Sequence, residues 1–239
     1  MRNIVFKPWV GNDYATNKFG ARILVLGESH YGDPEDEHEE YTKEVVQLWA
    51  KENRLAKKKK IAKTILNLDS SEYLTDDAKT EFWENVAFYN YIQKIVGEGA
   101  RIRPASDMWE SSAPALFEVI KDLDPQIIYV LGKELADNLP QLPSGIEVCY
   151  LSHPSSGGYS YAENNSKAQK AIEIVKKNDD LLLQQLLDEK KLDTPFKVTD
   201  IQRKLHWGYP RATNVCERGV VKGTLTKIEK DDGILYLAN

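Results

Sequence analysis

Short apolar runs alternate with longer amphipathic stretches along most of this chain. Four runs are typical of buried strands, and they lie at Ile23–Leu26, Val86–Ile92, Ile127–Leu131 and Glu147–Leu151. The stretches between them carry apolar residues at helical spacing, and they lie at 35–68, 112–123, 133–135 and 167–176. Strands that alternate with helices predict right-handed β–α–β units. We therefore expect an α/β fold with a four-stranded, mostly parallel sheet and helices on both faces.

The pattern changes in the last quarter of the chain, after Lys177. The predicted elements there are three helices and two short strands, at 181–192, 199–205, 210–218, 224–228 and 234–237. The two strands are joined through Asp231-Asp232-Gly233, which is typical of a hairpin turn. Three helices followed by a hairpin predict a winged helix-turn-helix. The expected domains are 1–177 and 178–239.

Composition narrows the class of protein but names no activity. The chain has 239 residues, of which 41% are hydrophobic and 29% charged, as in ordinary globular proteins. Its two cysteines, Cys149 and Cys216, are too few for a disulfide framework or a zinc site. The first residues lack the apolar core of a signal peptide, and no apolar run approaches membrane-spanning length. These features predict a cytoplasmic protein with no metal or cofactor.

Charge is unevenly distributed along the chain. The net charge is −5, but residues 195–239 contain eight Lys or Arg and five Asp or Glu, so they carry +3 and the rest carries −8. A basic tail on an acidic body indicates that the tail contacts an anionic partner.

Two polar segments directly follow predicted strands. Residues 27–32 (Gly-Glu-Ser-His-Tyr-Gly) follow the first strand, and residues 152–158 (Ser-His-Pro-Ser-Ser-Gly-Gly) follow the fourth. Open α/β sheets bind ligands at the carboxyl ends of their strands. We therefore expect Glu28, His30 and His153 to face a common crevice.

These segments, taken in order with two others, resemble the uracil-DNA glycosylase superfamily over about residues 20–177. Gly27–Tyr31 is similar to the first active-site motif of that superfamily, and Phe88-Tyr89-Asn90 is similar to the strand whose asparagine binds the extruded base. Val130–Lys133 is similar to the third strand and its turn, and His153-Pro154-Ser155 is similar to the second active-site motif. The resemblance implies a hydrolase that cleaves the N-glycosidic bond of an extruded, damaged or modified base in DNA.

The chemistry of base excision suggests a role for each matching residue. The sugar passes through an oxocarbenium-like state while the base departs as an anion. The site therefore needs an acceptor that positions water and a donor to the base, for which Glu28 and His153 are the natural candidates. Asn90 offers donor and acceptor groups to a base edge. Tyr31 and Phe88 are expected to line or stack on the base, and Ser155 and Ser156 to contact phosphates.

Each of these residues also has a plainer structural interpretation. A carboxylate at position 28 can cap the following turn, and His153 can bond the backbone at a strand end. Asn90, Tyr31 and Phe88 can belong to the core, and the two serines can cap a turn. The sequence leaves these alternatives open.

Three departures from the superfamily pattern put the substrate in doubt. Ser29 stands where the best-known branch has aspartate, and His30 stands where the family usually has proline. Both are candidate accessory residues, with His30 a possible second acid–base group or phosphate contact. Gly157 stands where those enzymes often have a wedging leucine, which Tyr159 or Tyr161 would have to replace. The acidic stretch 33–40 would also repel phosphate unless it folds away from the site.

The tail, about 195–222, resembles the gamma winged-helix domain at the C-terminus of bacterial DNA translocases. The matching segments are Gln202–Leu205, Gly208-Tyr209, Arg211-Ala212 and Glu217–Val221. The resemblance implies binding to duplex DNA, while the absence of a P-loop argues against translocation. The candidate DNA contacts are Arg203, Lys204, Tyr209, Arg211, Asn214 and Arg218. Docking of another protein is the alternative for such a domain.

Two other functions compete with base excision. The first is a non-catalytic protein that binds or senses DNA on a glycosylase-like scaffold, since fold does not determine function. The second is an ester hydrolase, because Gly27-Glu28-Ser29-His30 also resembles the Gly-Glu-x-His signature of erythromycin-esterase-like proteins. That alternative requires Glu28 and His30 to act together on water.

Overall fold

The structure, a computed structural model, describes residues 3–51, 56–99, 102–230 and 233–239, without the side chains of 51 and 56–58. The described chain divides into two compact units. The first comprises residues 1–17 and 22–171, and the second comprises residues 18–21 and 172–239. The boundary near residue 171 lies inside a continuous helix.

The first unit is an α/β structure built on one sheet. Its strands are β1 (Trp9–Val10), β2 (Ile23–Gly27), β3 (Ala87–Asn90), β4 (Ile127–Leu131) and β5 (Glu147–Leu151). Its helices are η1 (Pro34–Asp36), α1 (Tyr41–Lys51), α2 (Ala56–Ile65), α3 (Asp76–Glu84), α4 (Ser106–Leu123), α5 (Lys133–Asn138) and the beginning of α6 (Tyr161–Asp188). The strand order is β1-β3-β2-β4-β5.

The sheet has one strand more than the four predicted. Strands β3, β2, β4 and β5 are parallel to their neighbours, as expected, but β1 adds an antiparallel edge beside β3. With only two residues, β1 is too short to produce a recognisable alternation of polar and apolar positions. Its register is held by Trp9, whose indole Nε1–H donates to the carbonyl of Trp83 at 2.8 Å.

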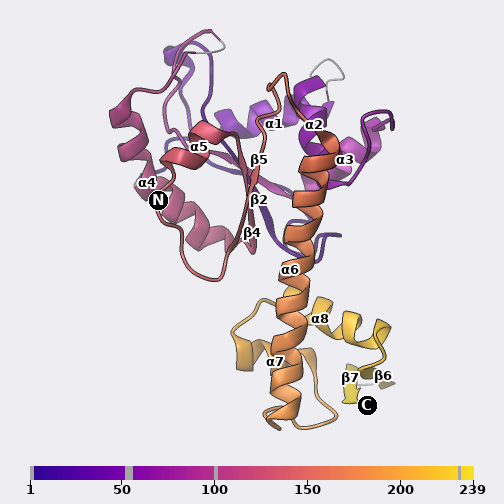
Figure 1. Cartoon of the computed structure of the whole chain (residues 1–239). Helices are drawn as coiled ribbons and strands as arrows, with labels where there is room; N and C mark the ends of the chain where they lie inside the picture. The colour runs from indigo at the N-terminus through magenta and orange to yellow at the C-terminus, as the bar shows by residue number, and fades with distance from the viewer. Residues whose placement is uncertain (1–2, 52–55, 100–101, 231–232) are drawn as a thin grey trace. The chain divides into compact units, whose positions relative to one another are not determined.

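Helices cover both faces of the sheet, as the alternating pattern predicted. On one face, Leu26 and Val130 of the strands pack in a core with Leu116 of α4 and Leu135 of α5. The opposite face carries Phe88, which packs against aromatic side chains of α1 and α3. Figure 1 shows α4 and α5 on one side of the sheet and α1 and α3 on the other. The central strands are buried on both faces, which explains their continuous apolar sequences.

Helix α6 corrects the predicted break after Lys177. The sequence indicated separate helices at 167–176 and 181–192, but a single helix of 28 residues runs from Tyr161 to Asp188. The polar residues Asp179 and Asp180, which suggested the break, lie within the helix and are paired with arginines of α8 (Tyr209–Val221). Those ion pairs explain why a polar segment continues the helix.

The second unit contains the end of α6, α7 (Val198–Leu205), α8 and a hairpin of β6 (Leu225–Lys230) and β7 (Gly233–Ala238). The predicted helices and strands after residue 195 are therefore present. The turn residues Asp231 and Asp232 lie outside the described residues. Phe196 and Tyr236 exchange backbone hydrogen bonds, and their rings stack with centroids 6.0 Å apart. This pairing ties the segment before α7 to the hairpin and closes the unit's small core.

Within the part of the chain that is described, no helix has the length and apolar character needed to cross a membrane.

Candidate functional site

Polar side chains lie at the carboxyl ends of three of the four parallel strands, and a glycine follows the fourth. Asn90 ends β3, Glu28 follows β2, Gly132 follows β4 and His153 lies two residues after β5. Because adjacent strands are about 4.8 Å apart, β2 and β5, with β4 between them, are separated by about 10 Å. Glu28 and His153 therefore flank β4 at the carboxyl edge, where open α/β sheets bind ligands.

Glu28 is largely buried and paired with an arginine. Its side chain is 11% exposed, and Arg103 Nη1 lies 3.3 Å from Oε1 and 3.5 Å from Oε2. Arg103 also lies 3.0 Å from Oε2 of Glu134, in the first turn of α5. Burial raises the pKa of Glu28 above its ordinary value, the Glu134 carboxylate raises it further, and Arg103 lowers it. The Glu28 carboxyl group therefore keeps its proton to a higher pH than a fully solvated carboxyl group does.

Ser29 lies beside this carboxyl group. Its hydroxyl is buried and makes no hydrogen bond of standard geometry with the described residues, although it lies close enough to Glu28 to favour the ionised form. A contact with Glu28 is therefore the accessory role that the structure supports for Ser29.

Asn90 is packed directly against Gly27. The two residues are register partners in β3 and β2, and Asn90 is 5% exposed. A Cβ atom built on Gly27 would lie 2.1 Å from Asn90 Oδ1, a distance at which one group must move. Gly27 is therefore needed so that the Asn90 amide can lie across the end of β2.

His153 is exposed and oriented by the loop that follows it. Its Nδ1 accepts a hydrogen bond from the Ser155 backbone N–H at 3.1 Å, and its carbonyl accepts one from the Ser156 N–H at 2.8 Å. In a neutral imidazole an accepting Nδ1 places the proton on Nε2, which becomes a donor. The ring also lies close to Gly132, where an added Cβ would approach His153 Cβ to 3.1 Å.

Ser155 and Ser156 are exposed in the turn after His153, so their hydroxyl groups are accessible to a ligand. Their backbone N–H groups orient His153, which is the turn-forming role that the sequence left open. A wedging role for Tyr159 is not supported, because its hydroxyl is bonded to Thr64 at 2.7 Å and Lys60 covers its ring. Tyr161 is likewise covered by Lys63.

Phe88 belongs to the core, which corrects its predicted role in stacking on a base. It is 2% exposed, and its ring lies edge-on to Trp49 at 5.0 Å and to Trp83 at 6.0 Å. The tip of its ring packs against Gly27, because a Cβ atom added to Gly27 would lie 3.1 Å from Phe88 Cζ. Phe88 therefore supports the end of β2 without offering a free ring face.

His30 is also a core residue, which corrects its predicted accessory role. It is 4% exposed, its Nε2 lies 2.8 Å from the Thr42 hydroxyl, and its ring packs edge-on against Phe6 and Tyr41. These contacts use the His30 side chain for packing within the core. The Glu28–His30 pair required by the ester-hydrolase hypothesis is therefore unsupported.

Tyr31 remains available at the edge of the site. Its side chain is 38% exposed, and its backbone carbonyl accepts a hydrogen bond from the Tyr41 hydroxyl at 3.1 Å. That bond fixes the backbone at Tyr31 and leaves the ring exposed, so it can line a pocket.

The acidic stretch 33–40 makes its own contacts within the first unit. Lys7 forms ion pairs with Glu39 and Glu40 at 2.8 and 3.3 Å, and Glu37 accepts a hydrogen bond from the Ile95 backbone N–H at 2.7 Å. These contacts offset part of its charge.

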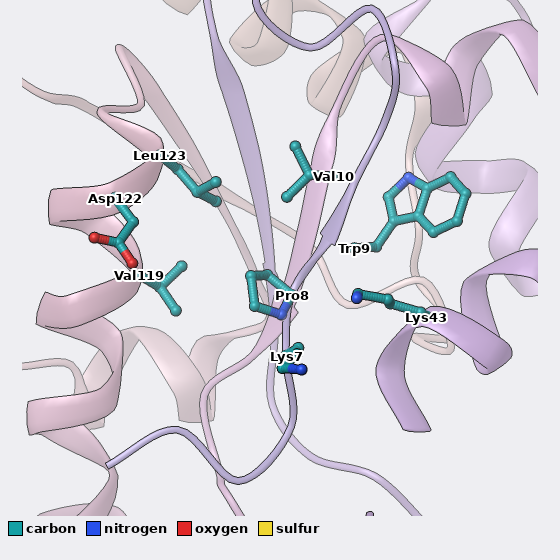
Figure 2. Close-up of a pocket in the computed structure, with 8 residues that line it drawn as sticks. All are labelled: Lys7, Pro8, Trp9, Val10, Lys43, Val119, Asp122 and Leu123. Atoms are coloured by element: carbon teal, nitrogen blue, oxygen red, sulfur yellow. The ribbon is translucent and has the colours of Figure 1, made fainter. Parts of the chain in front are cut away.

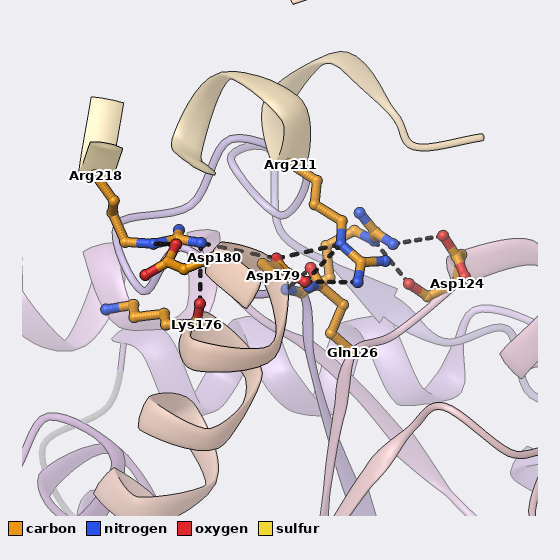
Figure 3. A network of polar contacts seen from close by, with 8 residues as sticks. Asp124, Gln126, Lys176, Asp179, Asp180, Arg211 and Arg218 are labelled. Carbon is orange, nitrogen blue, oxygen red and sulfur yellow. Dashed lines mark hydrogen bonds and ion pairs between the residues drawn. The ribbon is translucent and has the colours of Figure 1, made fainter. Parts of the chain in front are cut away.

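Two of the residues predicted to contact DNA form ion pairs with aspartates inside the second unit. Arg211 donates to Asp179 at 2.7 and 3.2 Å, and Arg218 donates to Asp180 at 2.8 Å (Figure 3). The Asp179 side chain is only 1% exposed. These contacts correct the prediction that both arginines are free to bind phosphates or guanine.

The other predicted DNA contacts are more accessible. Arg203 is paired with Asp200 but is 77% exposed, Lys204 is exposed, and Tyr209 is 56% exposed. Asn214 is half-buried on α8. The accessible groups therefore lie on α7 and at the start of α8.

A separate hollow of about 420 Å³ lies at the β1 edge of the sheet. Figure 2 shows its lining residues, which are Lys7, Pro8, Trp9, Val10, Lys43, Val119, Asp122 and Leu123. None of them is a predicted site residue. The hollow is mostly apolar, and both of its lysines are paired with Glu40, so nothing in it indicates chemistry.

Arg103 and Glu134 are the site residues that sequence reasoning missed. Arg103 lies in an irregular segment without a recognisable motif. Glu134 directly follows the Val130–Lys133 segment. Its nearness to the end of a predicted strand was the only signal that it could belong to the site. Among the described residues, no group of three or more His, Cys, Asp or Glu side chains is arranged to hold a metal ion.

Comparison with known proteins finds no protein-family model that matches this chain and no curated protein with significant sequence similarity to it.

Proposed function

We propose that the protein is a DNA glycosylase-like hydrolase that releases an extruded, damaged or modified base. The observation that supports this proposal is the position of Asn90, Glu28 and His153 at the carboxyl ends of β3, β2 and β5 in one sheet. Glu28 is an acceptor, His153 Nε2–H is a donor and Asn90 offers both groups, which are the functions that base excision requires.

The proposed reaction is a displacement at C1′ of the sugar. A water oxygen forms a bond to C1′ as the bond from C1′ to the base nitrogen breaks, and the Glu28 carboxylate accepts the proton released by the water. The electron pair of the broken bond leaves with the base, and His153 Nε2–H stabilises the negative charge that develops on it. Asn90 binds the base edge, and Tyr31 lines the pocket.

The experiment that tests this proposal measures free base released from a panel of oligonucleotides. Each oligonucleotide contains one damaged or modified base, in single-stranded and duplex form. We expect release from at least one member by the full chain, and a loss of about 10²-fold or more in His153→Ala, because that variant has no side-chain donor at this position. Release that is equal in the two proteins would contradict the assignment of His153.

Gly27→Ala is predicted to disable the site while the protein remains folded. The added Cβ must displace the Asn90 amide, so we expect base release to fall about tenfold or more and the free energy of unfolding to fall by about 1–3 kcal/mol. Gly157→Ala is the matched control, since no atom lies within 4 Å of its added Cβ. Wild-type release by Gly27→Ala would contradict a role for Asn90.

We further propose that the second unit is a winged helix that binds duplex DNA. Its α7, α8 and hairpin support this proposal, together with the exposed Arg203, Lys204 and Tyr209. Since Arg211 and Arg218 are bound to aspartates, we assign the main phosphate contacts to α7.

Replacement of Arg203 and Lys204 by glutamine is predicted to weaken duplex binding at low salt. Loss of two phosphate contacts should reduce the slope of log affinity against log salt by about 1.8, because each contact contributes about 0.9. Fluorescence anisotropy over a salt series measures this slope. The exposed pair Lys190 and Lys191, changed to glutamine, is the control. Equal slopes in the two double variants would contradict the assignment.

A further inference from the structure

One guanidinium joins two carboxylates at the candidate site. Arg103 Nη1 lies 3.3 Å from Glu28 Oε1 and 3.0 Å from Glu134 Oε2. Glu28 belongs to the loop after β2 and Glu134 to the first turn of α5, so Arg103 links two separate elements. We propose that Arg103 is a positioning residue that keeps Glu28 ionised and oriented, and that Glu134 holds Arg103 in place. This proposal rests on the proposed function.

The exposed fractions of the three side chains indicate that these ion pairs contribute more to the site than to the stability of the fold. The Arg103 side chain is 59% exposed and that of Glu134 is 38% exposed, whereas that of Glu28 is 11% exposed. Ion pairs between solvent-exposed groups contribute little to stability, because water and salt screen them. Because the Glu28 carboxylate is largely buried, water and salt screen its attraction to Arg103 less than they screen an exposed ion pair.

The charged groups that face Glu28 act in opposite directions. Burial and the Glu134 carboxylate both raise the pKa of Glu28, and the Arg103 guanidinium lowers it. Ser29 also favours the ionised form. Without Arg103, Glu28 would face another carboxylate with no cation between them, and its pKa would rise. A protonated Glu28 cannot accept a proton from water, so activity would be lost at a higher pH than in the wild type.

Both carboxylates contact the same guanidinium nitrogen of Arg103, Nη1, which the rigid planar group holds in place. A guanidinium presents several N–H donors in a planar fork, whereas an ammonium group is a compact charge on a flexible stem. Lysine would keep the positive charge but would orient Glu28 less well. Compared with Arg103→Met, Arg103→Lys should therefore move the pH profile part of the way back to that of the wild type, and it should recover a smaller part of kcat.

The test uses the full chain with Arg103→Met, Arg103→Lys and Glu134→Gln. The first measurement is the titration of the Glu28 carboxyl carbon by NMR, which requires no activity. The second is kcat and KM for base release across the acidic limb of the pH profile. For Arg103→Met we expect both the titration and the limb to move to higher pH, with kcat reduced about threefold or more on the limb and KM nearly unchanged. Arg103→Lys should fall between Arg103→Met and the wild type.

Glu134→Gln is the matched variant with the opposite electrostatic effect. It removes the carboxylate that raises the pKa of Glu28, which by itself moves the titration to lower pH. Because the proposal has Glu134 hold Arg103, the loss of Glu134 should also let Arg103 move, so that kcat falls even at high pH, where Glu28 is ionised in both proteins. A Glu134→Gln protein that matches the wild type in both titration and kcat would overturn the role assigned to Glu134.

The outcomes separate this proposal from the proposed function. An unchanged Glu28 titration in folded Arg103→Met overturns the positioning role, whether or not the protein releases bases. A shifted titration in a protein that releases no base from any tested oligonucleotide rejects the proposed function but supports the electrostatic role of Arg103. Thermal unfolding confirms that each variant is folded.

Discussion

Glu28→Gln is expected to lower the rate of base release by about 10²–10⁴-fold, the usual contribution of a positioned general base. Glutamine has nearly the same size as glutamate and can still contact Arg103, but it cannot accept a proton from the attacking water. The measurement is single-turnover release of free base from whichever oligonucleotide responds to the wild type. Because the chemical step is affected, kcat should fall and oligonucleotide affinity should remain close to that of the wild type.

The control for this variant is Glu35→Gln, which removes an exposed carboxylate from the nearby acidic stretch 33–40. It should release base at the wild-type rate. If Glu28→Gln and Glu35→Gln are equally active, Glu28 does not activate water, and its contact with Arg103 is only structural.

Asp179→Ala is expected to destabilise the second unit by about 3–5 kcal/mol, the usual cost of removing one partner from a buried ion pair. Asp179 is 1% exposed and accepts from Arg211 at 2.7 Å, and Arg218 lies 3.9 Å away (Figure 3). Its loss leaves Arg211 partly buried without its carboxylate. Chemical denaturation measures the free energy of unfolding.

Glu163→Ala provides the matched control in the same helix. Glu163 is exposed and paired with Lys167 at 2.6 Å, so its loss should cost only about 0–1 kcal/mol. A loss of stability in Asp179→Ala that is no greater than in Glu163→Ala would show that the polar segment at 179–180 does not depend on the arginines of α8.

The central strands β2, β3 and β4 of the first unit were predictable because burial on both faces gives them continuous apolar sequences. The predicted bounds of β4 and β5 agree with the structure, and β2 extends by only one residue, Gly27. Strand β1 was not predictable, since two residues carry no periodic pattern. The continuous helix α6 was missed because Asp179 and Asp180 are polar residues whose partners lie on a different helix.

The candidate site was predictable in location but not in every member. Position at a strand end indicated Glu28, Asn90 and His153, because all parallel strands end at one edge of a sheet. Position alone did not indicate which side chains face the core, so His30 and Phe88 were assigned wrongly. The partner Arg103 was not predictable, since its contacts with Glu28 and Glu134 join segments that are distant in the sequence.

The most direct test of the proposed site compares single-turnover base release by the wild type with release by Glu28→Gln, Asn90→Ala and His153→Ala. The three residues come from three strand ends, and the account requires that they act on one base. We predict that Glu28→Gln binds the responsive oligonucleotide as the wild type does, and that each of the three variants releases base at least about tenfold more slowly. Wild-type release by all three variants would contradict the account.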